Sequence, residues 1–158
     1  DLIVKHDVAF ISQSRIGRKL FNVALDYAKL NKDKSVIFCP HPDEVVELYT
    51  RYHEVCELNN LVISENHQDT LEAILVSNKV VGVYSTSLIE AVALGKRVFS
   101  IKLGGHEVLE REVKKGYICY AEDINDLNHK LSQDLVQNNL NVDISILYNA
   151  DIVGGLYD

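Results

Sequence analysis

Several sequence features are scarce or missing in this 158-residue chain, and each absence excludes a class of protein. No apolar run approaches the roughly 20 residues of a membrane span, and we expect no signal sequence. The 16 basic residues are outnumbered by 23 acidic ones and never cluster beyond a pair. The resulting net charge of −7 disfavours non-specific binding to nucleic acid. An anionic ligand would therefore need a local site.

Methionine and cysteine usage bears on the extent of the chain and on its compartment. The sequence contains no methionine and starts at Asp1, almost directly before a strand, so we expect it to be a piece of a longer protein. The three cysteines, Cys39, Cys56 and Cys119, are odd in number and lack the spacing of metal ligands. Cys39 and Cys119 lie inside apolar runs. They are interpreted as reduced, buried side chains of a cytoplasmic protein, and no metal site is predicted.

The pattern of apolar residues predicts the fold. Composition is 47% apolar and 25% charged, which suits one compact domain with a real core. Short apolar runs alternate with amphipathic ones, which is typical of α/β proteins. We expect a Rossmann-like parallel sheet of about six strands with helices on both faces, over residues 1–137, and a tail or linker over 138–158 that packs back on it. The predicted strands are 8–11, 35–39, 61–63, 80–84, 97–102 and 117–120, and the predicted helices are 16–30, 43–52, 69–77, 87–94, 108–115 and 123–137.

Residues 80–103 carry the most informative pattern, which joins a buried strand, a hydroxyl-rich turn, a helix and a second strand. Ser85, Thr86 and Ser87 supply hydroxyls and backbone N–H groups where the dipole of the following helix is positive. This arrangement suits a phosphate. A second interpretation stays open, in which Ser87 and Glu90 form a capping box and only satisfy the first amides of the helix.

Other polar residues follow other strands of the predicted sheet. His41 lies between Pro40 and Pro42, which restrict the backbone and keep helix from forming there. The carboxyl ends of parallel strands meet at one edge of a sheet, so His41 and the hydroxyl turn are expected to share a ligand site. Gln13 follows the first strand and is expected to line the same cleft, whereas its neighbour Ser14 is the expected helix cap.

A glycine pair lies in a further loop at this predicted edge. Gly104 and Gly105 leave backbone amides uncovered, so the loop either approaches a ligand closely or is an ordinary turn. The two interpretations are evenly matched. His106 and Glu107, next to the glycines, are weaker candidates for contacts to a ligand.

Two motifs carry a resemblance to a known family. Residues 40–44 (PHPDE) together with residues 84–95 (YSTSLIEAVALG) resemble the C-terminal, donor-binding half of GT-B glycosyltransferases. In particular they are similar to bacterial sialyltransferases and polysialyltransferases, which share His-Pro and Ser-Ser or Ser-Thr motifs, and more loosely to capsule and teichoic-acid polymer transferases. The resemblance covers roughly residues 8 to 135.

The resemblance implies a role for each matching residue. His41 would contact the donor phosphate or leaving group, Ser85 and Thr86 would hold phosphate oxygens, and Glu90 would bind ribose hydroxyls. It also implies a CMP- or CDP-activated sugar as the donor substrate, with no separate cofactor, and a role in making bacterial surface polysaccharide. The acceptor would be a glycan or a lipid-linked molecule, met at the inner face of the membrane by the full-length protein.

One departure from the family pattern concerns the general base. The sialyltransferases carry it in an acidic-acidic-glycine motif of their N-terminal half, and the acidic pairs here, at 43–44 and 122–123, are not followed by glycine. We therefore expect the base to lie in a missing N-terminal domain and the isolated chain to be inactive. Two alternatives stay open, a non-hydrolysing UDP-sugar 2-epimerase domain and a nucleotide-binding module without catalysis.

Overall fold

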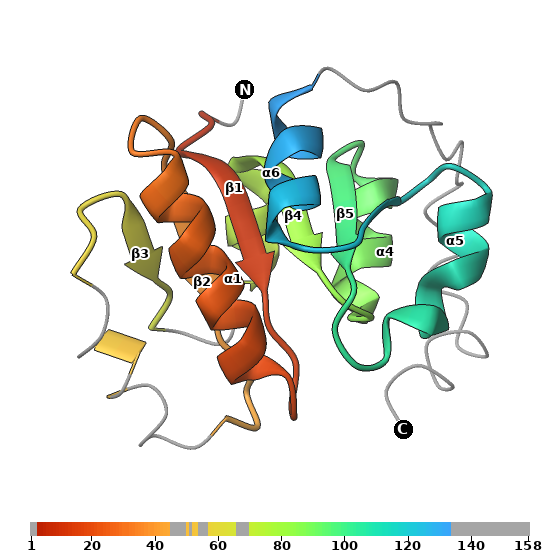
Figure 1. Cartoon of the computed structure of the whole chain (residues 1–158), viewed down its shortest axis with the longest axis horizontal. Coiled ribbons are helices and arrows are strands. Elements are labelled where there is room, and N and C mark those ends of the chain that lie inside the picture. Colours follow the sequence, from red (N-terminus) through yellow and green to blue (C-terminus); the bar gives the residue numbers. More distant parts are fainter. Residues whose placement is uncertain (1–2, 45–49, 51, 54–56, 66–69, 134–158) are drawn as a thin grey trace.

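The computed structural model describes residues 3–44, 50, 52–53, 57–65 and 70–133, and these form one six-stranded sheet (Figure 1). The strand order is β3-β2-β1-β4-β5-β6, and every pair of neighbours is parallel. The predicted fold class is confirmed. The strands are β1 (His6–Ile11), β2 (Val36–Cys39), β3 (Leu61–Ile63), β4 (Ser77–Gly82), β5 (Arg97–Ile101) and β6 (Cys119–Ala121).

Helices cover both faces of the sheet. Figure 1 shows α1 and α6 in front of the strands and α4 behind them. The helices are α1 (Gly17–Leu30), α3 (Thr70–Leu75), α4 (Thr86–Ala93), the 3₁₀ helix η2 (His106–Leu109), α5 (Glu110–Lys114) and α6 (Ile124–Ser132). None of the helices in the described ranges is long and apolar enough to cross a membrane.

The central strand β1 shows why the apolar runs are nearly continuous. Val8 and Phe10 pack into the cluster that includes residues of α1 and α6, whereas Ala9 and Ile11 pack into the cluster with α3 and α4. Successive side chains of a strand point to opposite faces, so a strand covered on both sides is apolar at every position. Burying a side chain such as Phe10 contributes about 1.5–3 kcal/mol.

Strand β4 begins earlier than the sequence pattern predicts, at Ser77 instead of Val80. The preceding helix ends at Leu75, because the next residues pair with β1: the backbone N–H of His6 donates to the carbonyl of Val76 at 3.1 Å, and Ser77 is in register with His6. Long-range pairing therefore overrides the local helical pattern.

The start of α1 also differs from the prediction. Ser14 is not the helix cap: the N-cap is Ile16, and it makes no side-chain capping bond. Arg15 separates the two residues and adopts a left-handed conformation, with φ of 75°, so the chain cannot enter the helix before it. Most of the predicted helix 43–52, the tail 138–158 and Cys56 lie outside the described residues.

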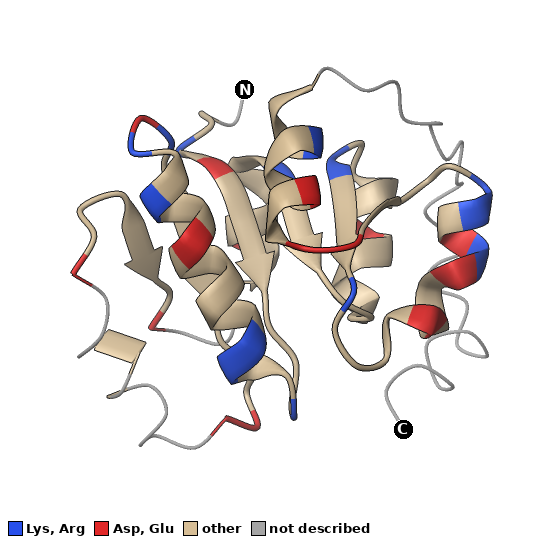
Figure 2. Ribbon diagram, in the orientation of Figure 1, with Lys and Arg blue, Asp and Glu red and all other residues tan. Residues whose placement is uncertain are grey.

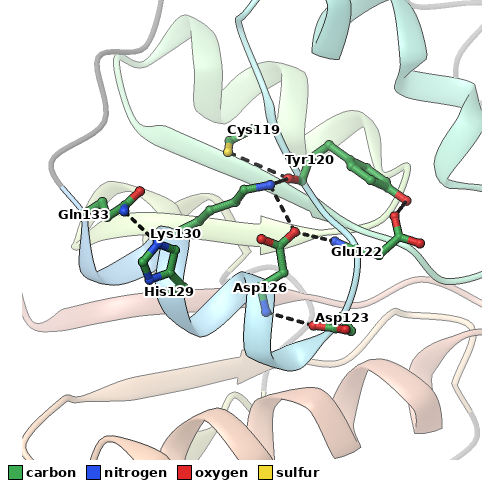
Figure 3. A network of polar contacts seen from close by, with 8 residues as sticks. All are labelled: Cys119, Tyr120, Glu122, Asp123, Asp126, His129, Lys130 and Gln133. Carbon is green, nitrogen blue, oxygen red and sulfur yellow. Dashed lines mark hydrogen bonds and ion pairs between the residues drawn. The ribbon is translucent and has the colours of Figure 1, made fainter.

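Helix α6 begins where the sequence predicts, since Asp123 is its N-cap. Its carboxylate accepts the backbone N–H of Asp126 at 2.8 Å, and the Asp126 carboxylate accepts that of Glu122 at 2.8 Å (Figure 3). Lys130 donates to Asp126 at 3.0 Å and to the Tyr120 carbonyl at 2.7 Å. These contacts fix the loop after β6.

Candidate functional site

The carboxyl edge of the sheet, where all six strands end, gathers the predicted site residues. β1 lies between β2 and β4, and the chain runs outward from β1 to β3 on one side and from β4 to β6 on the other. This reversal defines the switch point, where open α/β sheets bind ligands. His41 follows β2 and Ser85 follows β4, so both lie at the ends of the two strands that flank β1.

His41 is held in a tight turn by the prolines and by hydrogen bonds. The backbone N–H of Glu44 donates to the His41 carbonyl at 3.0 Å, which closes a four-residue turn with Pro42 at its second position. The backbone N–H of Asp43 donates to His41 Nδ1 at 3.1 Å. Because Nδ1 accepts, a neutral ring carries its proton on Nε2. The partly exposed ring thus offers an N–H donor at this edge.

Glu44 is a site residue that the sequence reasoning quoted but left without a role. It is only 8% exposed, and its Oε1 accepts the Ser12 hydroxyl at 2.6 Å and the His41 backbone N–H at 3.0 Å. The carboxyl group packs against Gly17, the first residue of α1. A negative charge is favourable at a helix start. Glu44 therefore ties the end of β1, the start of α1 and the Pro-His-Pro turn together.

The hydroxyl turn caps α4, but through Ser85 and not through Ser87. Ser85 Oγ accepts the backbone N–H of Ser87 at 3.2 Å, so Ser85 is the N-cap. The interpretation in which Ser87 and Glu90 form a capping box is wrong, because Leu88 occupies the third helical position. Thr86 N–H and the Thr86 and Ser87 hydroxyls make no hydrogen bond within the described chain, and both residues are half-buried.

Glu90 and Gln13 occupy different positions relative to this corner. Glu90 is half-buried in the second turn of α4. Gln13 is buried, and its Oε1 accepts the backbone N–H of Tyr84 at 2.7 Å across the switch point. A backbone N–H only donates, so the amide oxygen faces Tyr84, and the Gln13 amide nitrogen is left without a partner in the described ranges.

The two glycines of the loop after β5 have different surroundings. Gly105 has φ of 93°, and a Cβ built on it would lie 2.3 Å from Tyr84 Cε1. The ring of Tyr84 thus packs where a side chain at position 105 would lie, and glycine leaves room for it. A Cβ on Gly104 would have no atom within 4 Å, so that residue faces open space. His106 is tied to this loop, with Nδ1 2.9 Å from the Leu103 carbonyl.

Basic side chains lie near the start of α1 although the chain as a whole is acidic (Figure 2). Arg15, Arg18 and Lys19 are exposed and have no acidic partner among the described residues. Cations at a helix start oppose the helix dipole, so they do not stabilise α1. Lys102, at the end of β5, is by contrast neutralised by Glu122 at 2.8 Å. The free positive charge at this edge lies beside β1, and sequence reasoning missed it because the three residues form no cluster longer than a pair.

A cavity of about 280 Å³ lies at the opposite, amino edge of the sheet. Its polar groups are largely occupied: Asp7 accepts the Ser35 backbone N–H at 2.8 Å, Asn31 donates to Asn128 at 2.7 Å, and Lys79 donates to a backbone carbonyl of α6. The unpartnered donors of the α4 start and of the His41 ring lie at the carboxyl edge instead. We therefore take the carboxyl edge as the candidate site.

The fold can be compared with known proteins. No protein-family model matches the sequence, and no curated protein matches it. The crystal structure of TarM, a GT-B glycosyltransferase, is similar to 82% of this chain, with a TM-score of 0.57 and 20% sequence identity. The chain spans 28% of TarM. At this identity the likeness shows the fold alone, an α/β Rossmann-like domain consistent with one half of a GT-B protein.

Proposed function

We propose that this chain is the donor-binding half of a glycosyltransferase that uses a nucleotide-activated sugar. The observation that carries the proposal is the set of unpartnered donors at the switch point, formed by the start of α4 and the His41 ring. A phosphate group accepts such hydrogen bonds and is attracted to a helix start. The fold that the chain shares with part of TarM agrees with this function.

The positions of the residues suggest how the donor is held. Thr86 and Ser87 offer hydroxyls, and Thr86 offers its backbone N–H, to phosphate oxygens. Ser85 Oγ accepts from Ser87 and keeps its own proton free to donate. The Gln13 amide and the open face of Gly104 border the same edge. Glu90, deeper in α4, is assigned to the ribose hydroxyls.

The chemistry divides between this domain and a second one. Transfer needs a base that deprotonates the acceptor hydroxyl, and it needs stabilisation of the charge that grows on the departing phosphate. His41 Nε2–H and the α4 start supply the second requirement. The base is assigned to another domain of the full-length protein, which binds the glycan or lipid-linked acceptor. On the basis of the motif resemblance, we propose that the donor is a CMP- or CDP-sugar. The product is a bacterial surface polysaccharide, made at the inner face of the membrane.

A nucleotide panel tests this proposal on the chain itself. A ligand present at 100 times its Kd stabilises the folded state by about 2.7 kcal/mol, because it binds the folded form only. At about 2–4 °C per kcal/mol for a domain of roughly this size, the Tm rises by roughly 5–11 °C. We expect CMP or CDP to give this shift and His41→Ala to reduce it.

The panel also separates the alternatives. Protection by UDP in preference to CMP and CDP would favour the sugar-nucleotide epimerase. Protection by a cytidine nucleotide without turnover of any sugar donor by the full-length protein would favour a binding module. No protection by any nucleotide, with His41→Ala behaving like the wild type, would refute the donor site.

A further inference from the structure

The burial of the Glu44 carboxyl group does not by itself stabilise the folded state. Only its Oε1 is hydrogen-bonded, and Oε2 is buried without a partner among the described residues. An unpaired buried carboxyl oxygen is costly, so such a group is seldom kept for stability. Its environment is nonetheless built around it: a Cβ on Gly17 would lie 2.5 Å from Oε1, which only glycine avoids.

The contacts of Glu44 point to what this arrangement does. Oε1 accepts the backbone N–H of His41, and the backbone N–H of Glu44 donates to the His41 carbonyl, both at 3.0 Å. Both polar groups of the His41 backbone are thus fixed by one residue. The Ser12 hydroxyl, at 2.6 Å, anchors the same oxygen to the end of β1. The orientation of the imidazole relative to the switch point depends on this oxygen.

We propose that Glu44 is a positioning residue that fixes the His41 imidazole at the carboxyl edge through hydrogen-bond geometry, and not through its charge. The proposal rests on the function assigned to His41 above. At a preorganised site, misplacing a functional group by about 1 Å costs up to about a hundredfold in activity. A displaced Glu44 should therefore weaken the contact of His41 with the donor phosphate.

Two substitutions of Glu44 separate position from charge. Glu44→Gln keeps an acceptor oxygen at the position of Oε1 and removes the charge. Glu44→Asp keeps the charge but shortens the side chain by one methylene, so the carboxylate loses its reach to His41. We expect Gln to preserve the affinity for the nucleotide that protects best in the panel, and Asp to weaken it about tenfold or more. The exposed α5 residue Glu110 supplies the control, Glu110→Gln, which should change nothing.

Gly17→Ala provides a third variant, which replaces neither His41 nor Glu44. Alanine normally stabilises a helix relative to glycine. Here its Cβ would displace Oε1, so the variant should reproduce the weakened binding of Glu44→Asp. Unchanged affinity in Gly17→Ala and Glu44→Asp would overturn the proposal, as would loss of affinity in Glu44→Gln with retention in Glu44→Asp.

The ring nitrogens of His41 give a readout that needs no ligand. In ¹⁵N spectra of the free chain, the neutral ring should carry its proton on Nε2 in the wild type and in Glu44→Gln, because Asp43 N–H occupies Nδ1. Glu44→Asp and Gly17→Ala should show a mixture of tautomers. An identical His41 spectrum in all four proteins would overturn the positioning role. If the spectra change as expected while no nucleotide binds the wild type, the positioning role holds and the donor function fails.

Discussion

Replacing Gly105 with alanine tests the packing that joins two loops of the carboxyl edge. Gly105 has φ of 93°, and a Cβ there would lie 2.3 Å from Cε1 and 2.5 Å from Cδ1 of Tyr84. A non-glycine residue in this conformation costs about 1–3 kcal/mol. Forcing an extra carbon against a packed ring costs about 1–3 kcal/mol more. The expected loss is therefore about 2–6 kcal/mol of unfolding free energy.

The neighbouring glycine is the matched control. A Cβ on Gly104 meets no atom within 4 Å and its φ lies outside the strained positive range, so Gly104→Ala should be neutral or stabilise by up to about 1 kcal/mol. Urea unfolding measures both variants. With a slope of about 2 kcal/mol per molar urea, Gly105→Ala should lower the midpoint by about 1–3 M. Equal midpoints for the two variants would refute the reasoning.

Two further predictions concern pH. Burial, with the nearby carboxylates of Asp7 and Asp33, raises the pKa of Tyr27 to about 12. In the unfolded chain this hydroxyl ionises at a lower pH, near 10, so the free energy of unfolding should fall as pH rises from about 10 through 12. Tyr27→Phe should flatten this fall, measured as the urea midpoint. The backbone N–H of Glu122, and then Lys130, lower the pKa of Asp126 from its ordinary value of 3.8. The stability that ionised Asp126 contributes is present above that value and is lost as pH falls through the lower folded pKa. Asp126→Asn should therefore weaken the fall of the urea midpoint between about pH 5 and 2. For Tyr27 or Asp126, plots of midpoint against pH that run parallel in the variant and the wild type would contradict the assignment.

The sequence predicts the sheet well because its signal is local and strong. β1, β2 and β5 are apolar on both faces, and all three lie within two residues of their predicted bounds. The first residues of β4 were missed because they become a strand only by pairing with β1. Cys119, expected to be buried, is half-buried because β6 forms the edge of the sheet.

The candidate site was predicted only in part, for a similar reason. That His41 and Ser85 lie at one edge follows from the parallel order of strands, which the sequence indicated. The partnership of Glu44 with Ser12 and Gly17 depends on three segments that meet only in the fold. No local pattern separates a buried carboxyl group at such a junction from a solvated one. The binding roles assigned to His41, Ser85, Thr86, Ser87, Glu90, Gln13, Gly104 and Gly105 stay predictions.

The central claim is that a nucleotide phosphate binds at the carboxyl edge. Titration of the ¹⁵N-labelled chain with CDP, followed through the backbone amide signals, tests it most directly. The account predicts that the largest shifts belong to Thr86, Ser87 and Gly104, together with His41. Shifts centred instead on the amino-edge cavity around Asp7, or no shifts at saturating CDP, CMP and UDP, would contradict it.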